Sequence, residues 1–201
     1  MKLDEMSREE LAWAYDTHLR EAFPPSELKP LRAMERLMDR EVYDPLCLRD
    51  DSGTPLGFLL LWWHRSGKLG LIDYLCVPAA LRSRGIGAAM LRGLRSFYLD
   101  STLFLAESEA LTGDPARDAL IARRLAFYQR CGARLLPYDC ALFGVHFRTL
   151  LWGEGDSGEV LRMHQEIYQT DLGKAICDRY IQLPLAPGEA PIPAVEWTEE
   201  V

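Results

Sequence analysis

The chain has 201 residues, of which 48% are hydrophobic and 26% charged, and this composition supports one substantial buried core. The formal net charge of −7 argues against a nucleic-acid surface, because phosphate binding requires a dense basic patch. An acidic chain suits a cationic or amine-bearing partner, although it suits simple solubility equally well.

The sequence shows no pattern typical of secretion, membrane insertion or metal binding. The N-terminus is charged and lacks the apolar segment of a signal peptide. The longest apolar run, 56–63, is far shorter than the roughly 20 residues that cross a bilayer. The five cysteines form no Cys-x-x-Cys pair, and the four histidines lie apart. We therefore expect a soluble cytoplasmic protein with free thiols, no metal, and no membrane or nucleic-acid partner.

The first forty residues predict two helices. Ser7 and Glu10 have the spacing of a capping box, and apolar residues recur at helical intervals after them. The Pro-Pro pair at 24–25 ends this helix. Ser26 is placed to cap a second helix that continues to about Arg40.

Three strand-like runs follow, at 42–49, 56–63 and 69–77. They are separated by two short polar turns that contain Gly53 and Gly67. Turns this short connect antiparallel neighbours, so these runs predict a three-stranded meander.

The second half of the chain mixes helices and strands. The expected elements are a helix at 85–99, a buried strand at 101–108, a helix at 118–130 closed by Gly132, two strands at 134–138 and 142–152, and a helical region at 159–181 with a break at Gly173. This order favours an α+β fold over a doubly wound parallel sheet. We expect a single domain over 1–183 with a helical extension from about 158, and a Pro-rich tail over 184–201 that is extended or disordered.

A glycine-containing turn joins the third predicted strand to the next helix. It has the sequence Arg82-Ser83-Arg84-Gly85-Ile86-Gly87-Ala88. The first amides of a helix have no partner within it, and the helix dipole is positive at this end. Gly85 and Gly87 have no side chains to keep phosphate oxygens from these amides, and Arg82 and Arg84 add positive charge. These residues alone predict either a diphosphate cradle or a glycine-tolerant turn with solvated arginines.

Two other phosphate-binding loops do not fit this segment. A dinucleotide fingerprint would need glycine where Met90 stands, followed by an acidic residue after the next strand. A P-loop would need a Gly-Lys-Ser/Thr sequence, which is absent from this turn.

Two motifs in the chain are similar to those of one known family. The pattern Arg82-x-x-Gly85-x-Gly87, after a strand ending in Leu75-Cys76-Val77, resembles the acetyl-CoA-binding motif of the GNAT superfamily of N-acetyltransferases, Arg/Gln-x-x-Gly-x-Gly/Ala. The segment 126–133 is similar to the helix end of the same superfamily, Phe-Tyr-x-x-x-Gly. The motifs occur in the expected order, and the resemblance covers roughly residues 40–152.

The resemblance implies a GNAT-like mixed, mostly antiparallel sheet that splays open after Val77, with helices flanking it. It implies direct transfer of an acetyl group from acetyl-CoA to a primary amine. The amine could belong to a small molecule, an amino acid, an antibiotic or a protein N-terminus. The implied cofactor-binding residues are Leu75, Cys76, Val77, Arg82, Ser83, Arg84, Gly85, Ile86, Gly87 and Ala88.

The same resemblance implies that Tyr128 is the general acid that protonates the departing CoA thiolate. A phenol with a pKa near ~10 can deliver such a proton once it is held beside the sulfur. For the base, strand alternation places Glu107 and Glu109 on one face of the strand at 101–108 and its continuation. Glu107 is the candidate base, directly or through water, with Glu109 in reserve and Asp73 still open.

The chain departs from the family in three places. Met1-Lys2-Leu3 is hardly long enough for the usual first strand, Ala133 replaces an aromatic residue, and the region beyond Trp152 has no counterpart in the family core. Two rival functions stay open: a non-catalytic acyl-CoA-binding module that acts through a protein partner, and a nucleotide-binding domain that uses the same loop. The sequence also leaves a homodimer open.

Overall fold

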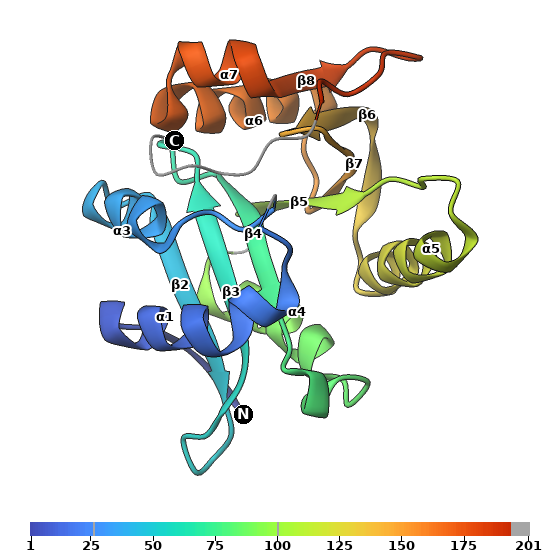
Figure 1. Cartoon of the computed structure of the whole chain (residues 1–201). Coiled ribbons are helices and arrows are strands. Elements are labelled where there is room, and N and C mark those ends of the chain that lie inside the picture. The colour runs from blue at the N-terminus through green and yellow to red at the C-terminus, as the bar shows by residue number, and fades with distance from the viewer. Residues whose placement is uncertain (26, 100, 194–201) are drawn as a thin grey trace. The chain divides into compact units, whose positions relative to one another are not determined.

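The computed structural model describes residues 1–25, 27–99 and 101–193, coloured from blue to red in Figure 1. The chain forms two compact units, one built from residues 1–102 and the other beginning at Leu103. Ser26, which the sequence predicts to cap the second helix, lies outside the described residues.

The first unit contains a four-stranded antiparallel sheet. Its strands, in spatial order, are β1 (Lys2–Glu5), β2 (Tyr43–Arg49), β3 (Pro55–Trp63) and β4 (Leu69–Cys76). The three-stranded meander that the turns predict is therefore confirmed. β3 is buried without interruption from Gly57 to Trp63, so both of its faces are covered.

β1 corrects the expectation that the N-terminus is too short for a strand. Lys2–Glu5 pairs with β2, and Leu3 faces Leu48 in the antiparallel register. Leu3 is buried. Four residues suffice because an edge strand needs a partner on one side only, and β2 supplies it.

The helices of the first unit begin with the predicted capping box. The helical elements are α1 (Arg8–Ala14), the π-helical η1 (Tyr15–Leu19), α2 (Arg20–Ala22), α3 (Leu31–Asp39), the 3₁₀ turn η2 (Ala79–Leu81) and α4 (Ile86–Phe97).

At α1, Glu10 N donates to Ser7 Oγ (3.2 Å) and Ser7 N donates to the Glu10 carboxylate (2.9 Å), which confirms the box. α3 begins five residues later than Ser26, because Pro30 keeps the preceding residue out of the helical conformation.

The strands of the second unit pair antiparallel in the order β5 (Leu103–Glu109), β7 (Val145–Trp152), β6 (Arg134–Leu142), β8 (Ile181–Leu185). β6 continues past Tyr138, where the sequence predicted its end, and it includes Pro137 because the register with β7 shifts between Leu135 and Asp139. A bulge of this kind accommodates a proline, which has no amide hydrogen for the ladder. β8 includes Pro184, which the sequence assigned to the tail.

Three helices belong to this unit: α5 (Pro115–Arg130), α6 (Ser157–Leu172) and α7 (Lys174–Tyr180). α5 begins earlier than predicted because Asp114 caps it, accepting from Arg117 N at 2.7 Å, and Pro115 occupies its first turn. The predicted break at Gly173 is confirmed; this residue has φ +82° and separates α6 from α7.

The described structure is therefore α+β with mostly antiparallel strands, as predicted. All five cysteines are free thiols. Over the described residues, none of the helices has the length and apolar character needed to span a membrane.

Candidate active site

The predicted phosphate-binding segment connects β4 to α4 through a left-handed turn. Ser83 and Gly85 have φ values of +63° and +79°. Gly85 is the N-cap of α4, and no side chain caps the helix there. A Cβ atom built at Gly85 meets nothing within 4 Å. The backbone conformation therefore favours glycine, and the space at its missing side chain is open.

Arg82 closes this turn onto the end of β4. Its Nε donates to the carbonyl oxygen of Val77 at 3.1 Å, and its backbone N–H donates to Ala79 O. Arg82, Ser83 and Arg84 are all exposed. The turn is thus held by the backbone of its own neighbours, and two arginines lie within four residues of the start of α4.

The first turn of α4 provides main-chain donors. The first amide that donates back to this end of the helix is Ala89 N, which donates to Gly85 O at 2.9 Å. The amides before it in the helix are those of Ile86, Gly87 and Ala88. The Ile86 side chain is buried and anchors the helix end. A helix start with no side-chain cap and nearby arginines can bind an anion such as a diphosphate.

Leu75, Cys76 and Val77 lead into this turn. Leu75 and Cys76 pair with Leu59 and Phe58 on β3, which fixes the course of the strand. Burial raises the pKa of the Cys76 thiol to about 11. Cys76 is therefore protonated at neutral pH and is not an activated nucleophile.

Tyr128 is held at the end of α5 by the helix terminus itself. Gly132 has φ +93°, Ala133 N donates to Tyr128 O (3.1 Å) and Gly132 N donates to Gln129 O (3.0 Å). These are the two bonds of a Schellman motif, and they confirm the predicted role of Gly132 as the helix end. The Tyr128 ring packs edge-on against Trp152, with centroids 5.6 Å apart.

The environment of Tyr128 keeps its hydroxyl protonated. Burial raises the pKa of this phenol above its ordinary value, and the nearby charge of Arg124 offsets only part of the increase. The group is therefore a proton donor over the whole neutral range, which a general acid requires.

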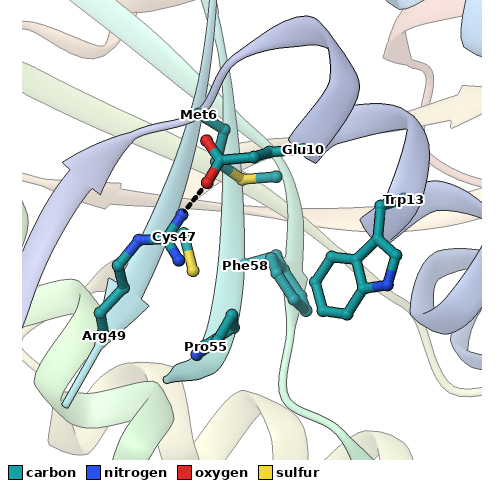
Figure 2. A pocket seen from close by; sticks show the side chains of 7 residues that line it. All are labelled: Met6, Glu10, Trp13, Cys47, Arg49, Pro55 and Phe58. Atoms are coloured by element: carbon teal, nitrogen blue, oxygen red, sulfur yellow. Dashed lines mark hydrogen bonds and ion pairs between the residues drawn. The ribbon is translucent and has the colours of Figure 1, made fainter. Parts of the chain in front are cut away.

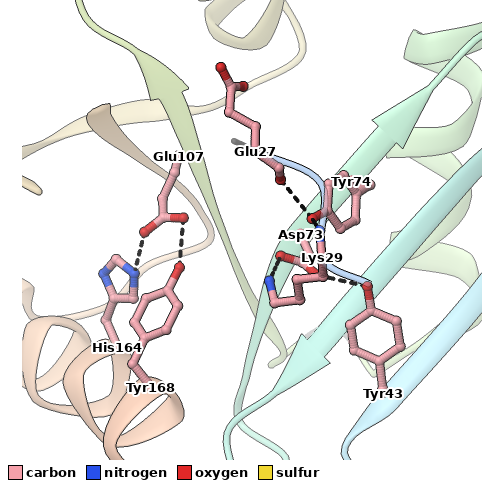
Figure 3. Close-up of polar contacts among 8 residues, drawn as sticks. All are labelled: Glu27, Lys29, Tyr43, Asp73, Tyr74, Glu107, His164 and Tyr168. Atoms are coloured by element: carbon pink, nitrogen blue, oxygen red, sulfur yellow. Dashed lines mark hydrogen bonds and ion pairs between the residues drawn. The ribbon is translucent and has the colours of Figure 1, made fainter. Parts of the chain in front are cut away.

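The three carboxylates considered as bases all have partners, and those of Glu107 and Asp73 are drawn in Figure 3. Glu107 accepts from His164 Nε2 at 2.9 Å and from Tyr168 OH at 2.8 Å. Glu109 forms an ion pair with Arg117. Asp73 accepts from Lys29 Nζ (2.5 Å) through one oxygen and from Tyr43 OH (2.7 Å) through the other.

The pairing of Asp73 indicates a structural role in the first unit. The side chains of Lys29 and Asp73 are 4% and 7% exposed, and the Lys29 ammonium lies 4.5 Å from the centroid of the Trp62 ring. This buried pair ties the segment before α3 to the middle of β4. Tyr74 adds a second tie, since its hydroxyl donates to Glu27 O at 2.8 Å.

We expect Tyr43→Phe to lower the free energy of unfolding by about 2 kcal/mol, because a hydrogen bond to a buried charged group is lost. Tyr43 is 3% exposed, and the ring remains to fill its site. Urea denaturation followed by circular dichroism measures the effect. An unchanged midpoint would show that the Tyr43 hydroxyl does not support the Asp73 carboxylate.

A cavity of about 250 Å³ lies elsewhere in the first unit (Figure 2). It is lined by Met6, Glu10, Trp13, Cys47, Arg49, Pro55 and Phe58. Glu10 and Arg49 form an ion pair beside it, and Trp13 packs edge-on against Phe58 at 5.9 Å. None of the predicted site residues lines this cavity.

The sequence missed the partners of the carboxylates. His164 and Tyr168 are four residues apart on α6, and both lie on its buried face with Val160, Met163 and Ile167. A histidine on the otherwise apolar face of a helix indicates that it has a buried polar partner. Which carboxylate it meets depends on a contact 57 residues away in the chain, and no local pattern encodes this contact.

The class of the protein, an acetyltransferase, is shown by a match to a known family. The family model described as the acetyltransferase (GNAT) family matches residues 8–133. The chain belongs to the GNAT acetyltransferase family, and the resemblance inferred from its two motifs is confirmed.

Several solved structures have a similar fold. A putative GNAT-family acetyltransferase from Bacteroides thetaiotaomicron has a TM-score of 0.71 at 20% identity, over 87% of this chain and 99% of that one. An aminoglycoside 6′-N-acetyltransferase complexed with coenzyme A has a TM-score of 0.58 at 14% identity, over 78% and 100%. A spermidine N-acetyltransferase from Vibrio cholerae, in complex with CoA and spermine, has a TM-score of 0.54 at 9% identity, over 75% and 94%. A search of curated proteins finds no match.

Proposed function

We propose that this acetyltransferase uses acetyl-CoA and transfers its acetyl group directly to a primary amine of a small cationic acceptor. The observation that carries the proposal is the turn before α4, in which Gly85 has φ +79° and leaves the helix start without a side-chain cap. Main-chain amides and two arginines are what a diphosphate requires.

The residues of the first unit fit the parts of acetyl-CoA. The diphosphate binds to the amides of residues 84–88, with Arg82 and Arg84 nearby. The pantetheine arm follows the backbone of Leu75 and Val77, at the end of β4. Two structures of similar fold were solved with coenzyme A bound, which supports the choice of donor.

Tyr128 and Glu107 are the acid and the base in this proposal. Tyr128 gives its hydroxyl proton to the CoA sulfur as the carbon–sulfur bond breaks. Glu107 accepts the proton that the amine loses as the carbon–nitrogen bond forms, directly or through water. The products are an amide, CoA as a thiol, a protonated Glu107 that returns its proton to solvent, and a Tyr128 phenolate that takes one up.

The acceptor class is inferred from charge and from the neighbours. The net charge of −7 favours binding of cations over anions. The similar structures include enzymes named for spermidine and for aminoglycosides, both of which are small molecules with several amines. We therefore place polyamine-like and aminoglycoside-like amines first among acceptors.

Calorimetric titration with acetyl-CoA, followed by a thiol-release assay with spermidine and an aminoglycoside, tests the proposal. We expect acetyl-CoA to bind with a Kd of about 1–100 μM, which corresponds to about −8 to −5 kcal/mol, and at least one amine to release CoA. Absence of acetyl-CoA binding would contradict the proposal.

The same assays separate the two rival functions. Binding of acetyl-CoA without thiol release from any tested amine would favour a non-catalytic acyl-CoA-binding module. A nucleotide-binding domain would bind ADP as tightly as CoA, because the pantetheine arm would contribute nothing.

A further inference from the structure

Helix α6, from the region beyond the motif-bearing part of the chain, contacts Glu107 through two side chains (Figure 3). His164 Nε2 lies 2.9 Å from Glu107 Oε1, and the Tyr168 hydroxyl donates to Oε2 at 2.8 Å. Residues four apart on a helix present their side chains on the same face, so α6 offers both donors together. Each oxygen of Glu107 therefore has a donor from this helix.

A third donor comes from β6. The Cys140 thiol donates to Glu107 Oε1 at 3.3 Å, and burial raises the pKa of this thiol well above its ordinary value. The side chain of Glu107 is 12% exposed and His164 is fully buried. A carboxylate removed from water in this way stays charged only where donors replace the water.

At Glu107 the hydrogen-bond donors lower the pKa by more than burial raises it. Burial by itself raises the pKa of the Glu107 carboxyl, but the hydrogen bond and charge of His164, with the hydrogen bonds from Tyr168 and Cys140, hold it below its usual value. His164 contributes the largest of the lowering effects. The carboxylate is therefore ionised at neutral pH, as a base must be before it accepts a proton.

The neighbours of His164 determine that its Nε2 carries a hydrogen. Its hydroxyl lies 3.2 Å from His164 Nδ1, and burial raises the pKa of this phenol, so it retains its hydrogen. Glu107 Oε1, when ionised, only accepts, so Nε2 must carry a hydrogen. Whether the ring is neutral or protonated, the Nε2–H points to Glu107.

We infer that His164 is a positioning residue that keeps Glu107 ionised and oriented for proton removal, so that helix α6 serves the acetyl-transfer reaction. The inference rests on the proposed role of Glu107 as the base. A purely structural network would use the same contacts to stabilise the fold, without any effect on the pH dependence of the reaction.

The sign of the pH effect follows from the groups that face Glu107. These are His164 and Tyr168 from α6, and Cys140 and Tyr138 from β6; Thr149, its partner on β7, does not titrate. Without the imidazole, burial is less well opposed and the pKa of Glu107 rises. The base then becomes protonated at a higher pH, so activity is lost sooner as the pH falls.

Two substitutions of His164 separate hydrogen bonding from packing. His164→Leu removes the donor and fills the space, while His164→Gln keeps an N–H that can reach Oε1. Tyr168→Phe keeps the ring, removes the other α6 donor and serves if His164→Leu does not fold. Gln165→Leu is the control, because it breaks the bond from Gln165 Nε2 to Leu183 O (2.8 Å), which links α6 to β8 away from Glu107.

The measured quantity is the ratio of variant to wild-type kcat/KM for acetyl transfer from pH 5 to pH 8, in which the ionisation of the acceptor amine cancels. For His164→Leu we expect this ratio to fall by up to about threefold between pH 8 and pH 5 for a rise of about one unit in the base pKa, because the wild-type carboxyl is still mostly ionised at pH 5. His164→Gln should restore most of the lost activity, and Gln165→Leu should give a ratio that does not depend on pH.

The titration of the Glu107 side-chain carboxyl carbon by ¹³C NMR provides a readout that does not depend on activity. A higher titration midpoint in His164→Leu, together with the falling ratio, supports the inference. An unmoved midpoint in the folded variant overturns it, whatever the reaction is. A moved midpoint with a flat ratio also overturns it and removes Glu107 as the base, while acetyl-CoA binding by calorimetry still tests the donor separately.

Discussion

Gly87→Glu is expected to weaken acetyl-CoA binding at least a hundredfold, about 2.7 kcal/mol or more. Gly87 is the second residue of α4, beside the amides assigned to the diphosphate. A carboxylate there occupies the space that phosphate oxygens need and repels their charge. The substitution should leave the fold intact, because an acidic side chain in the first turn of a helix is favourable.

The matched control is Leu99→Glu, which adds the same charge beyond the other end of α4. Leu99 is 79% exposed, so its replacement disturbs no packing. Calorimetric titration should give near wild-type affinity for this control, and thermal unfolding should show both variants folded. Equal affinity for wild type and a folded Gly87→Glu would contradict the assignment of the turn to the diphosphate.

Local patterns predicted the parts of the fold that local chemistry determines. The capping box at Ser7 and Glu10, the end of α5 at Gly132 and the break at Gly173 each depend on residues within a few positions of one another. The turn before α4 was identified for the same reason: glycines and arginines at short spacing have a direct physical meaning at a helix start.

The elements that were misjudged depend on distant partners or on a neighbouring proline. β1 exists because β2 pairs with it, although it is more than thirty residues away. β6 passes through Pro137 because a register shift absorbs the missing donor. α3 begins only at Leu31 because Pro30 keeps the residue before it out of the helical conformation. In each case tertiary pairing or backbone restriction outweighed the apparent pattern.

In the candidate site, too, local patterns identified a residue, while its distant neighbours could not be predicted. Strand alternation identified Glu107 as a carboxylate on a suitable face, but it gave no indication of the donors that decide whether this carboxylate is charged. Those donors include Cys140 on β6 and His164 on α6, which lie 33 and 57 residues further along the chain. The charge state of a buried group is a property of its tertiary neighbours, so a single sequence names the candidate but not its chemistry.

Tyr128→Phe is expected to reduce kcat for acetyl transfer about a hundredfold or more, because one positioned acid typically contributes this much to a reaction. The variant keeps the ring and its edge-on contact with Trp152, so the end of α5 should remain folded. The affinity for acetyl-CoA should not change. Because burial raises the pKa of this phenol, wild-type activity should not decline from loss of the Tyr128 proton until the pH exceeds about 10.

Tyr180→Phe is the appropriate comparison, since Tyr180 also belongs to the second unit and stacks on Phe143 at 5.2 Å, outside the predicted site. Its kcat should equal that of the wild type. If Tyr128→Phe retained wild-type thiol release and amide formation, the acid would not be Tyr128, and the leaving thiolate would have to depart unprotonated or take its proton from water. A loss of kcat in Tyr128→Phe alone, with acetyl-CoA still bound, ties the hydroxyl to the chemical step, because neither variant alters the segment from β4 to α4.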